Sequence, residues 1–335
     1  MLRIALNGLG RIGRTFVRAL LERQLDRYVK LVAINDLGDP HTLTHLLQYD
    51  SCFGRLPHAV HLRGGQLSLG GQRIKWLRER DPWLLPWASM GIDLVIECSG
   101  TLKTREQAEH HLTAGAQRVL LSHPLDSADL TVVYGVNHDR LRAQQVVSNA
   151  SCTTNCLAPL AMILHQSVGI AQGLVNTVHA YTNDQSLVDR VHDDLLRARA
   201  AALSMIPTST GAAKTIGLVI PELAGRLDGL SVRVPTASVS LLDLTFRAER
   251  PTSREALHKA LLAGMQQMPP GVMECTDVPL VSSDYRAHPA SCVVDFNHTR
   301  VQGDLVKVLA WYDNEWAFAN RLLDVMVTWQ HLGRA

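Results

Sequence analysis

The chain has 335 residues, and 46% of them are apolar, so it is long enough for two domains that each bury a core. Its 33 Lys and Arg residues nearly balance its 31 Asp and Glu residues, which argues against nucleic acid as the main partner. The six cysteines are scattered along the chain, which favours a reduced protein over a disulfide-bonded one. The N-terminus shows no basic segment that leads into a long apolar core, and no apolar run reaches about 18 residues. We therefore expect a cytoplasmic protein with no membrane partner.

A glycine-rich turn lies between two apolar runs at the start of the chain. Residues 2–7 (LRIALN) predict a strand, GLGRIG follows, and the apolar spacing after it predicts a helix. In this G-x-G-x-x-G pattern Gly8 permits a tight turn, Gly10 lets the backbone approach a pyrophosphate, and Gly13 lets the helix pack close to the strand. The pattern alone is weak evidence, because a plain glycine-rich turn between a strand and a helix would also produce it.

A second predicted strand strengthens the dinucleotide interpretation. Residues 30–36 (KLVAIND) end in Asp36. A carboxylate at the end of this strand can accept hydrogen bonds from both hydroxyls of an adenosine ribose. It would also repel a 2′-phosphate, so the sequence predicts NAD rather than NADP as the cofactor.

Strands and helices continue to alternate up to residue 150. A helix is predicted over 104–116, with Thr104 and Gln107 spaced as a capping box and with His110 and His111 on the solvent side. Repeated strand–helix–strand units predict a parallel, doubly wound sheet with ligands at the carboxyl ends of its strands. Further strands are predicted at 91–100, 117–122, 132–136 and 145–149, and the polar residues expected along the ligand edge are Asp36, Ser99, Ser122 and Asn149.

The run SNASCTTNC places Cys152 where a helix is expected to begin. Ser151 can cap that helix, and apolar residues recur at helical spacing from Leu157 to Val168. Pro159 would remove one internal hydrogen bond, but it lies beyond the first turn. A thiol in the first turn faces unpaired backbone N–H groups and the positive end of the helix dipole, and both favour the nucleophilic thiolate.

A buried structural cysteine is the alternative for Cys152, and it is the expected role of Cys156 one turn deeper. A C-x-x-x-C metal site lacks partner ligands at usable spacing, so no metal is expected. A reactive thiol also needs a base. Residues 173–184 predict a strand that carries His179 near its end, although spacing alone does not single out this histidine among the 15 in the chain.

Five segments that occur in a fixed order resemble one enzyme family. They are SNASCTTNCLAP, HAYTNDQ, IPTSTGAAK, RVPT and WYDNEW, and the similarity extends from RIALNGLGRIGR to WYDNEWAFANRLLD. The combination resembles phosphorylating glyceraldehyde-3-phosphate dehydrogenase. This resemblance implies that Cys152 is the nucleophile and His179 its base, and that His179 and the Cys152 N–H stabilise the oxyanion. It also implies a homotetramer in which residues 183–206 contact a neighbouring subunit.

The same resemblance implies binding roles for further residues. Those implied to hold NAD are Gly8, Gly10, Arg11, Ile12, Gly13, Asp36, Arg80, Ser122 and Asn314. Those implied to hold the phosphate of the substrate aldehyde are Thr182, Asp184, Arg197 and Arg233. Those implied to hold the attacking inorganic phosphate are Ser151, Thr153, Thr210 and Gly211. Hydroxyls, N–H groups and two arginines would hold both anions without a metal.

The implied chemistry is the oxidative phosphorylation of an aldehyde. Thiolate attack on glyceraldehyde 3-phosphate gives a thiohemiacetal, loss of hydride to NAD⁺ gives a thioester, and attack by phosphate releases 1,3-bisphosphoglycerate. Arsenate has nearly the shape and charge of phosphate, so we also expect it to be accepted, with a role in arsenate detoxification left open.

Some segments depart from the family pattern. Phe318 stands where the family usually has Tyr, Ala317 where it often has Gly, and Leu196 where an Arg is common. The runs LSHPLDSADLTVVYGVN, PLVSSD and NEWAFANRLLD also resemble the sister family, erythrose-4-phosphate dehydrogenase, although that family usually lacks TND and TSTGAA. Two alternatives therefore stay open: an erythrose-4-phosphate dehydrogenase, and a non-enzymic NAD or thiol sensor.

The chain is expected to divide into two domains. Residues 1–150 are predicted to form an NAD-binding Rossmann domain, and residues 151–314 an α+β catalytic domain with a mostly antiparallel sheet. An amphipathic helix is predicted over 253–267. A last helix over 315–335 is expected to return to the first domain.

Overall fold

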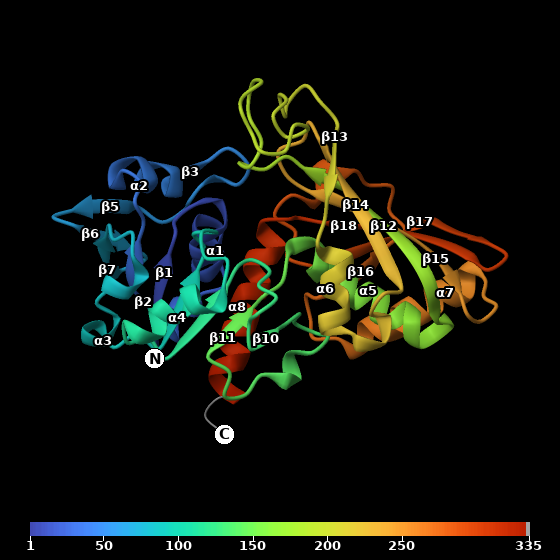
Figure 1. Cartoon of the computed structure of the whole chain (residues 1–335), viewed down its shortest axis with the longest axis horizontal. Coiled ribbons are helices and arrows are strands. Elements are labelled where there is room, and N and C mark those ends of the chain that lie inside the picture. The colour runs from blue at the N-terminus through green and yellow to red at the C-terminus, as the bar shows by residue number, and fades with distance from the viewer. Residues whose placement is uncertain (333–335) are drawn as a thin grey trace. The chain divides into compact units, whose positions relative to one another are not determined.

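The computed structural model describes residues 1–332, which form two compact units. Unit 1 comprises Met1–Val132, His138–Ala150 and the segment that begins at Ala319, and unit 2 comprises Val133–Asn137 and Ser151–Phe318. Figure 1 shows that each unit has a sheet of its own with helices packed on it.

Unit 1 is built on a nine-stranded sheet in the order β10-β11-β9-β8-β1-β2-β7-β6-β5. All neighbours from β10 to β7 run parallel, and Ile4, Ala5 and Leu6 of the central strand are fully buried, as expected for a sheet covered on both faces. The strands are β1 (Leu2–Asn7), β2 (Val29–Asn35), β5 (Val60–Arg63), β6 (Gln66–Leu69), β7 (Gln72–Leu77), β8 (Leu94–Glu97), β9 (Arg118–Leu121), β10 (Leu130–Thr131) and β11 (Val146–Ser148).

The predicted doubly wound parallel sheet is confirmed, with two differences. β6 pairs antiparallel with both β5 and β7, so one edge of the sheet is a meander. The strand predicted at 132–136 is wrong, because β10 ends at Thr131 and the chain then turns. Gly135 has φ +88°, a left-handed conformation that an extended strand cannot contain. A separate short pair is formed by β3 (Tyr49–Asp50) and β4 (Gly54–Arg55).

Among the residues that the structure describes, unit 1 has five α-helices: α1 (Arg11–Glu22), α2 (Pro40–Gln48), α3 (Trp87–Met90), α4 (Arg105–Thr113) and α8 (Trp316–Leu332) from Ala319 onward. The capping box predicted for α4 is confirmed: the Thr104 side chain accepts from the Gln107 N–H, and the Gln107 side chain accepts from the Thr104 N–H.

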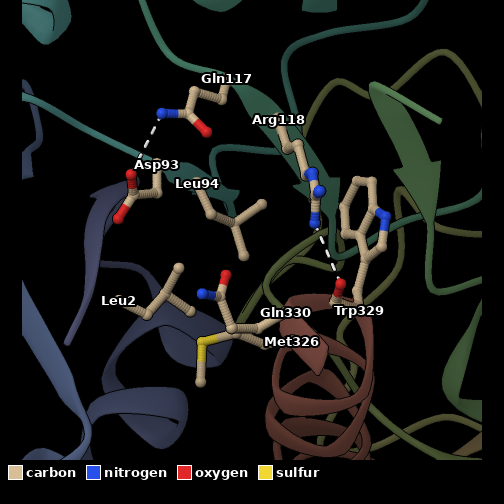
Figure 2. Close-up of a pocket in the computed structure, with 8 residues that line it drawn as sticks. All are labelled: Leu2, Asp93, Leu94, Gln117, Arg118, Met326, Trp329 and Gln330. Carbon is tan, nitrogen blue, oxygen red and sulfur yellow. Dashed lines mark hydrogen bonds between the residues drawn. The ribbon is translucent and has the colours of Figure 1, made fainter. Parts of the chain in front are cut away.

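The last turns of α8 lie against the amino ends of the parallel strands. Figure 2 shows Trp329 and Met326 near Leu2 and Leu94, around a pocket of about 150 Å³. Arg118 donates to the Trp329 carbonyl (3.0 Å), and its guanidinium lies 5.2 Å from the centre of the Trp329 ring. These contacts attach the helix to the sheet of unit 1.

Unit 2 contains a seven-stranded sheet in the order β13-β14-β12-β15-β18-β17-β16. Two neighbouring pairs, β12–β14 and β16–β17, run parallel and the others antiparallel, so the predicted mostly antiparallel sheet is confirmed. The strands are β12 (Ile170–Ala180), β13 (Ile206–Ser209), β14 (Leu227–Val234), β15 (Ser240–Ala248), β16 (Met273–Thr276), β17 (Cys292–Gln302) and β18 (Leu305–Tyr312).

Three helices pack on this sheet, and they are α5 (Cys152–Val168), α6 (Ala212–Val219) and α7 (Arg254–Gln267). α7 begins within one residue of its prediction, and the Ser253 side chain accepts from the Ala256 N–H at its start. Within residues 1–332, none of the helices combines the length and the apolar character that crossing a membrane requires.

Candidate functional site

The turn between β1 and α1 has the geometry that its glycines predict. Gly8 has φ +94°, and a Cβ on it would lie 2.6 Å from the Ser99 nitrogen. A Cβ on Gly13 would lie 2.1 Å from the Gly8 carbonyl oxygen, so only glycine lets α1 pack this close. A Cβ on Gly10 would enter open space, which is the approach that a phosphate group needs.

A pocket of about 400 Å³ adjoins this turn. The Asp36 carboxylate on its wall accepts from the Leu9 N–H (2.6 Å) and the Gly38 N–H (2.7 Å), one bond to each oxygen. Each oxygen keeps a second lone pair for a ribose hydroxyl. Gly10 caps α1 without a side-chain bond, and the N–H groups and positive dipole end of a helix start favour an anion. The pocket residues are Asn7, Gly8, Gly10, Asn35, Asp36, Leu37, Glu79, Arg80, Pro82, Cys98, Ser99 and Thr101, and they fit a dinucleotide.

The other residues predicted to hold NAD occupy three places. Arg11, Ile12 and Gly13 form the first turn of α1, and the Arg11 guanidinium is paired with Asp50 (2.5 Å). Ser122 follows β9 and donates its N–H to the Glu97 carbonyl (2.9 Å). Asn314 belongs to unit 2, where its side-chain oxygen accepts from the Ser240 hydroxyl (3.1 Å).

Cys152 and His179 come together in unit 2. The helix predicted at Cys152 is confirmed: α5 begins there, and the Ser151 hydroxyl accepts from the Thr154 N–H (3.0 Å). His179 is the penultimate residue of β12, and its Nε2 lies 3.4 Å from the Cys152 Sγ. His179 is buried, whereas Cys152 keeps partial exposure. A helix start and a strand end thus hold a thiol and an imidazole in direct contact.

Two groups with opposite requirements lie close to the other ring nitrogen of His179. The Ala180 carbonyl lies 2.7 Å from Nδ1 and can only accept, which favours a proton on Nδ1, whereas a guanidinium beside Nδ1 can only donate, which favours a proton on Nε2. With the proton on Nδ1, which is the tautomer that proton transfer from Cys152 requires, Nε2 presents its lone pair to the thiol. The Arg233 guanidinium lies 2.5 Å from Nδ1 and donates to the same carbonyl (3.2 Å), so a positive charge stands directly behind the imidazole.

This environment favours the uncharged form of both the imidazole and the thiol. Burial, followed by the charge of Arg233, lowers the pKa of His179 to about 3. Burial raises the pKa of the Cys152 thiol, and Arg233 and Thr153 offset only part of that rise. The backbone N–H groups of Cys152 and Thr153 lower the pKa of the thiol, in the direction expected of a helix start, but desolvation of the sulfur is the larger effect and the net shift is upward.

The low pKa of His179 predicts an acid-sensitive stability. An unfolded histidine titrates near 6.5, so between about pH 3 and 6.5 the unfolded chain binds one proton more than the folded chain. The unfolding free energy should therefore fall on acidification through this window, by at most about 1.4 kcal/mol per pH unit from this residue. Urea unfolding midpoints between pH 4.5 and 7.5 should fall less steeply in His179→Gln; equal slopes would contradict the assignment.

Three of the four residues predicted to hold the substrate phosphate interact electrostatically. Arg197 lowers the pKa of Arg233 and Asp184 raises it, while burial is the largest influence and lowers it. Arg197 is paired with Asp184 and donates to the Thr208 hydroxyl (2.9 Å). The Thr182 N–H donates to the Gln185 side chain (3.2 Å). In this state the charge of Arg197 is balanced by a carboxylate, so an incoming phosphate would have to compete with Asp184.

The residues predicted to hold inorganic phosphate lie at the starts of two helices. Ser151 and Thr153 stand at the start of α5, and Gly211 caps α6 beside Thr210, whose hydroxyl accepts from the Ala212 N–H (3.3 Å). The Thr153 hydroxyl bonds to the Tyr312 hydroxyl (2.9 Å) and is buried. Helix starts supply donors for an anion, and these side chains add hydroxyls to them.

Two residues of unit 2 were missed by the sequence argument. The Tyr312 hydroxyl bonds to both Thr153 and Thr177 (2.8 Å), which ties the start of α5 to β12. The Ser240 hydroxyl accepts from the Ala180 N–H (3.1 Å) and donates to Asn314, which links the strand of His179 to a residue expected to hold NAD. Tyr312 lies inside the segment WYDNEW, but nothing in the sequence shows that its hydroxyl is buried and hydrogen-bonded.

Comparison with known proteins identifies the family. A family model described as the NAD binding domain of glyceraldehyde 3-phosphate dehydrogenase matches residues 2–105, and one described as its C-terminal domain matches residues 151–314. A glyceraldehyde-3-phosphate dehydrogenase of Xanthobacter flavus is 51% identical over 99% of this chain and 99% of its own length. A glyceraldehyde-3-phosphate dehydrogenase of Pseudomonas aeruginosa is 52% identical over 96% of each chain. The chromosomal glyceraldehyde-3-phosphate dehydrogenase of Cupriavidus necator is 51% identical over 98% of this chain and 99% of its own length. The chain therefore belongs to the glyceraldehyde-3-phosphate dehydrogenase family and is an NAD-dependent oxidoreductase.

Proposed function

We propose that this chain oxidises glyceraldehyde 3-phosphate and phosphorylates the product to 1,3-bisphosphoglycerate. The observation that carries the proposal is the contact of 3.4 Å between the Cys152 Sγ and the His179 Nε2, with Arg233 beside it. The names of the relatives support the substrate, since each is a glyceraldehyde-3-phosphate dehydrogenase.

Cys152 begins the reaction as the nucleophile. Its thiol transfers a proton to the His179 Nε2 while the sulfur attacks the aldehyde carbon, which gives a thiohemiacetal. The Cys152 N–H at the start of α5 and the protonated His179 stabilise the developing oxyanion. His179 then returns this proton to the oxyanion, which completes the neutral thiohemiacetal. NAD⁺, held by the glycine turn and Asp36, would supply the hydride acceptor for oxidation to the thioester. In that oxidation the neutral His179 takes the hydroxyl proton of the thiohemiacetal.

Arg233 connects substrate binding to the basicity of His179. In the resting chain the guanidinium lies 2.5 Å from the His179 Nδ1 and lowers the pKa of the ring. A phosphate dianion bound by Arg233 offsets that positive charge, so the pKa of His179 rises when the substrate is in place. The base is thereby weak in the empty site and stronger in the complex that needs it.

The second half of the reaction uses a different anion. Inorganic phosphate, held by Ser151, Thr153, Thr210 and Gly211, attacks the thioester carbon and releases Cys152 as a thiolate. Hydroxyl and N–H donors recognise the tetrahedral oxygens rather than the central atom. We therefore propose that arsenate also reacts to give a labile product, a reaction that would serve arsenate detoxification.

A steady-state assay with two aldehydes and two anions tests this function. NADH formation from glyceraldehyde 3-phosphate should depend on phosphate, and arsenate should substitute for it. Phosphate-independent oxidation of erythrose 4-phosphate, with little turnover of glyceraldehyde 3-phosphate, would favour erythrose-4-phosphate dehydrogenase. No turnover of either aldehyde would leave a non-enzymic NAD or thiol sensor.

We also propose that the chain acts as a homotetramer. The segment 183–206 carries seven exposed apolar side chains, which are Leu187, Val188, Val191, Leu195, Leu196, Leu203 and Met205. A monomer rarely exposes so many neighbouring apolar side chains to solvent, so we infer that contact with another copy of the chain buries them. Sedimentation equilibrium should give four chains per particle; a monomer at micromolar concentration would contradict this.

A further inference from the structure

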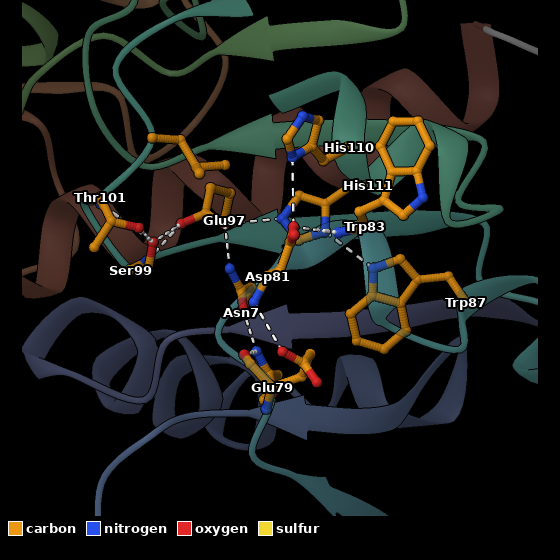
Figure 3. A network of polar contacts seen from close by, with 12 residues as sticks. Asn7, Glu79, Asp81, Trp83, Trp87, Glu97, Ser99, Thr101, His110 and His111 are labelled. Atoms are coloured by element: carbon orange, nitrogen blue, oxygen red, sulfur yellow. Dashed lines mark hydrogen bonds and ion pairs between the residues drawn. The ribbon is translucent and has the colours of Figure 1, made fainter. Parts of the chain in front are cut away.

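A fully buried carboxylate lies at the carboxyl end of β8. Glu97 has no solvent exposure, and Figure 3 shows its contacts. One oxygen accepts from the Ser99 N–H (2.7 Å) and the Ser99 hydroxyl (2.5 Å). The other accepts from the Asn7 amide (2.6 Å) and the His111 Nε2 (3.0 Å). Four donors therefore surround this carboxylate.

His111 was expected on the solvent side of α4, and that prediction is wrong. The side chain is fully buried, and the Trp87 indole N–H donates to its Nδ1 (3.0 Å). An indole nitrogen can only donate, so Nδ1 is the acceptor and the proton is on Nε2, directed at Glu97. Trp87 thus sets the tautomer of His111, and the ring presents a donor to the carboxylate (Figure 3).

The hydrogen bonds continue across the ends of β1 and β2. The Asn7 carbonyl oxygen accepts from the Asn35 amide (2.7 Å), and Asn35 exchanges two bonds of 2.8 Å with the backbone of Glu79. The direction of each amide is determined, because rotating Asn7 would turn its carbonyl toward the Glu97 carboxylate. Glu97 is thus the terminal acceptor of a directed series that crosses three neighbouring strands.

These same residues form part of the wall of the NAD pocket. Asn7, Asn35, Glu79 and Ser99 all line it, whereas Glu97 and His111 lie beneath its surface with no exposure. The Ser99 nitrogen is also the atom that a Cβ on Gly8 would approach to 2.6 Å. A shift of the Ser99 segment would therefore alter both the pocket wall and the space left for the glycine turn.

The number of donors explains why a carboxylate stands here. Burial opposes ionisation of Glu97, but the hydrogen bonds from His111, Asn7 and Ser99 outweigh it and lower the pKa of this carboxyl below its ordinary value. A glutamine has the same shape, but its NH₂ group would face two donors on one side. Either Ser99 or the Asn7 and His111 pair would then lose its acceptor.

We propose that Glu97 is a positioning residue of the NAD site, which together with His111 holds the Ser99 wall and the Gly8 turn in the shape that binds the cofactor. The inference depends on NAD binding by unit 1 and not on which aldehyde is the substrate. It assigns a function to two buried residues that lie outside the pocket lining. A purely structural role would instead lower stability without changing the affinity of the folded protein.

The test compares NAD affinity with catalysis in Glu97→Gln. Loss of a charge-assisted hydrogen bond to the wall should raise the NAD dissociation constant about tenfold or more, measured by titration calorimetry on the full chain. The KM for NAD should rise in parallel, whereas kcat at saturating NAD should change less than about threefold, because chemistry occurs at other residues. The rate of Cys152 alkylation by iodoacetamide should be unchanged, which separates this proposal from the proposed role of the thiol.

Two variants of His111 provide the matched pair. In His111→Gln the amide can donate to Glu97 and accept from Trp87, so NAD affinity should stay close to that of the original chain. In His111→Leu the carboxylate loses one donor and the indole its acceptor, so affinity should fall as in Glu97→Gln. If His111→Leu and Glu97→Gln lower the thermal midpoint but bind NAD with unchanged affinity, the proposal is wrong. If Glu97→Gln does not fold, the difference in NAD affinity between His111→Gln and His111→Leu tests the proposal without it.

Discussion

Replacing Cys152 by serine should reduce turnover of glyceraldehyde 3-phosphate by at least about 10³-fold, because an alcohol is a much weaker nucleophile than a thiol and a poorer leaving group from the acyl intermediate. The serine hydroxyl can keep the contact with His179, so the fold should be retained. NAD binding by unit 1 should also persist, since Cys152 belongs to unit 2. Coupled NADH assays and calorimetry measure the two effects separately.

Cys156 offers the matched control for this substitution. It lies one turn further along α5 and is fully buried, so Cys156→Ala creates a small cavity. We expect a lower thermal midpoint and a kcat within about threefold of the original value. Turnover that survives in Cys152→Ser but is lost in Cys156→Ala would reassign the nucleophile.

Replacing Arg233 by glutamine should separate phosphorylated from unphosphorylated substrates. The value of kcat/KM for glyceraldehyde 3-phosphate should fall about a hundredfold, because bonds between the guanidinium and the phosphate dianion are lost. The value for glyceraldehyde, which has no phosphate, should change only a few fold. Arg199 is an exposed arginine held by Asp189 (2.8 Å), and Arg199→Gln should leave both values unchanged. Equal losses for the two aldehydes in Arg233→Gln would place Arg233 outside the substrate phosphate site.

The elements that sequence reasoning located well are those with local signals. The glycine turn, the capping box of α4 and the start of α5 each depend on residues a few positions apart, so their pattern is visible along the chain. The strand β12 carries His179 near its end, as was predicted for residues 173–184, although it begins at Ile170 and ends at Ala180. The partner of Cys152, in contrast, could be named only through the family resemblance, because nothing local connects residues 27 positions apart.

Three features could not be read from the sequence because they depend on tertiary burial. The run VVYGV has the composition of a strand, but after one backbone bond from Val132 to Ser148 of β11 (2.8 Å) the pairing ends and Gly135 turns the chain. His111 follows His110 on a polar helix, and only the packing of Trp87 and Glu97 shows that it is buried. The helix-start argument for Cys152 was correct in geometry but omitted desolvation, which raises the pKa of the thiol.

Mass spectrometry of the acyl-enzyme tests the central claim, which is that Cys152 carries the substrate through the reaction. The full chain is mixed with glyceraldehyde 3-phosphate and NAD⁺ without phosphate or arsenate, quenched in acid and digested. We expect a burst of about one NADH per chain and a 3-phosphoglyceroyl group on the peptide that contains Cys152. When phosphate is added before the acid quench, this acyl group should be absent. An NADH burst with the acyl group on another residue, or with no acyl group at all, would contradict the account.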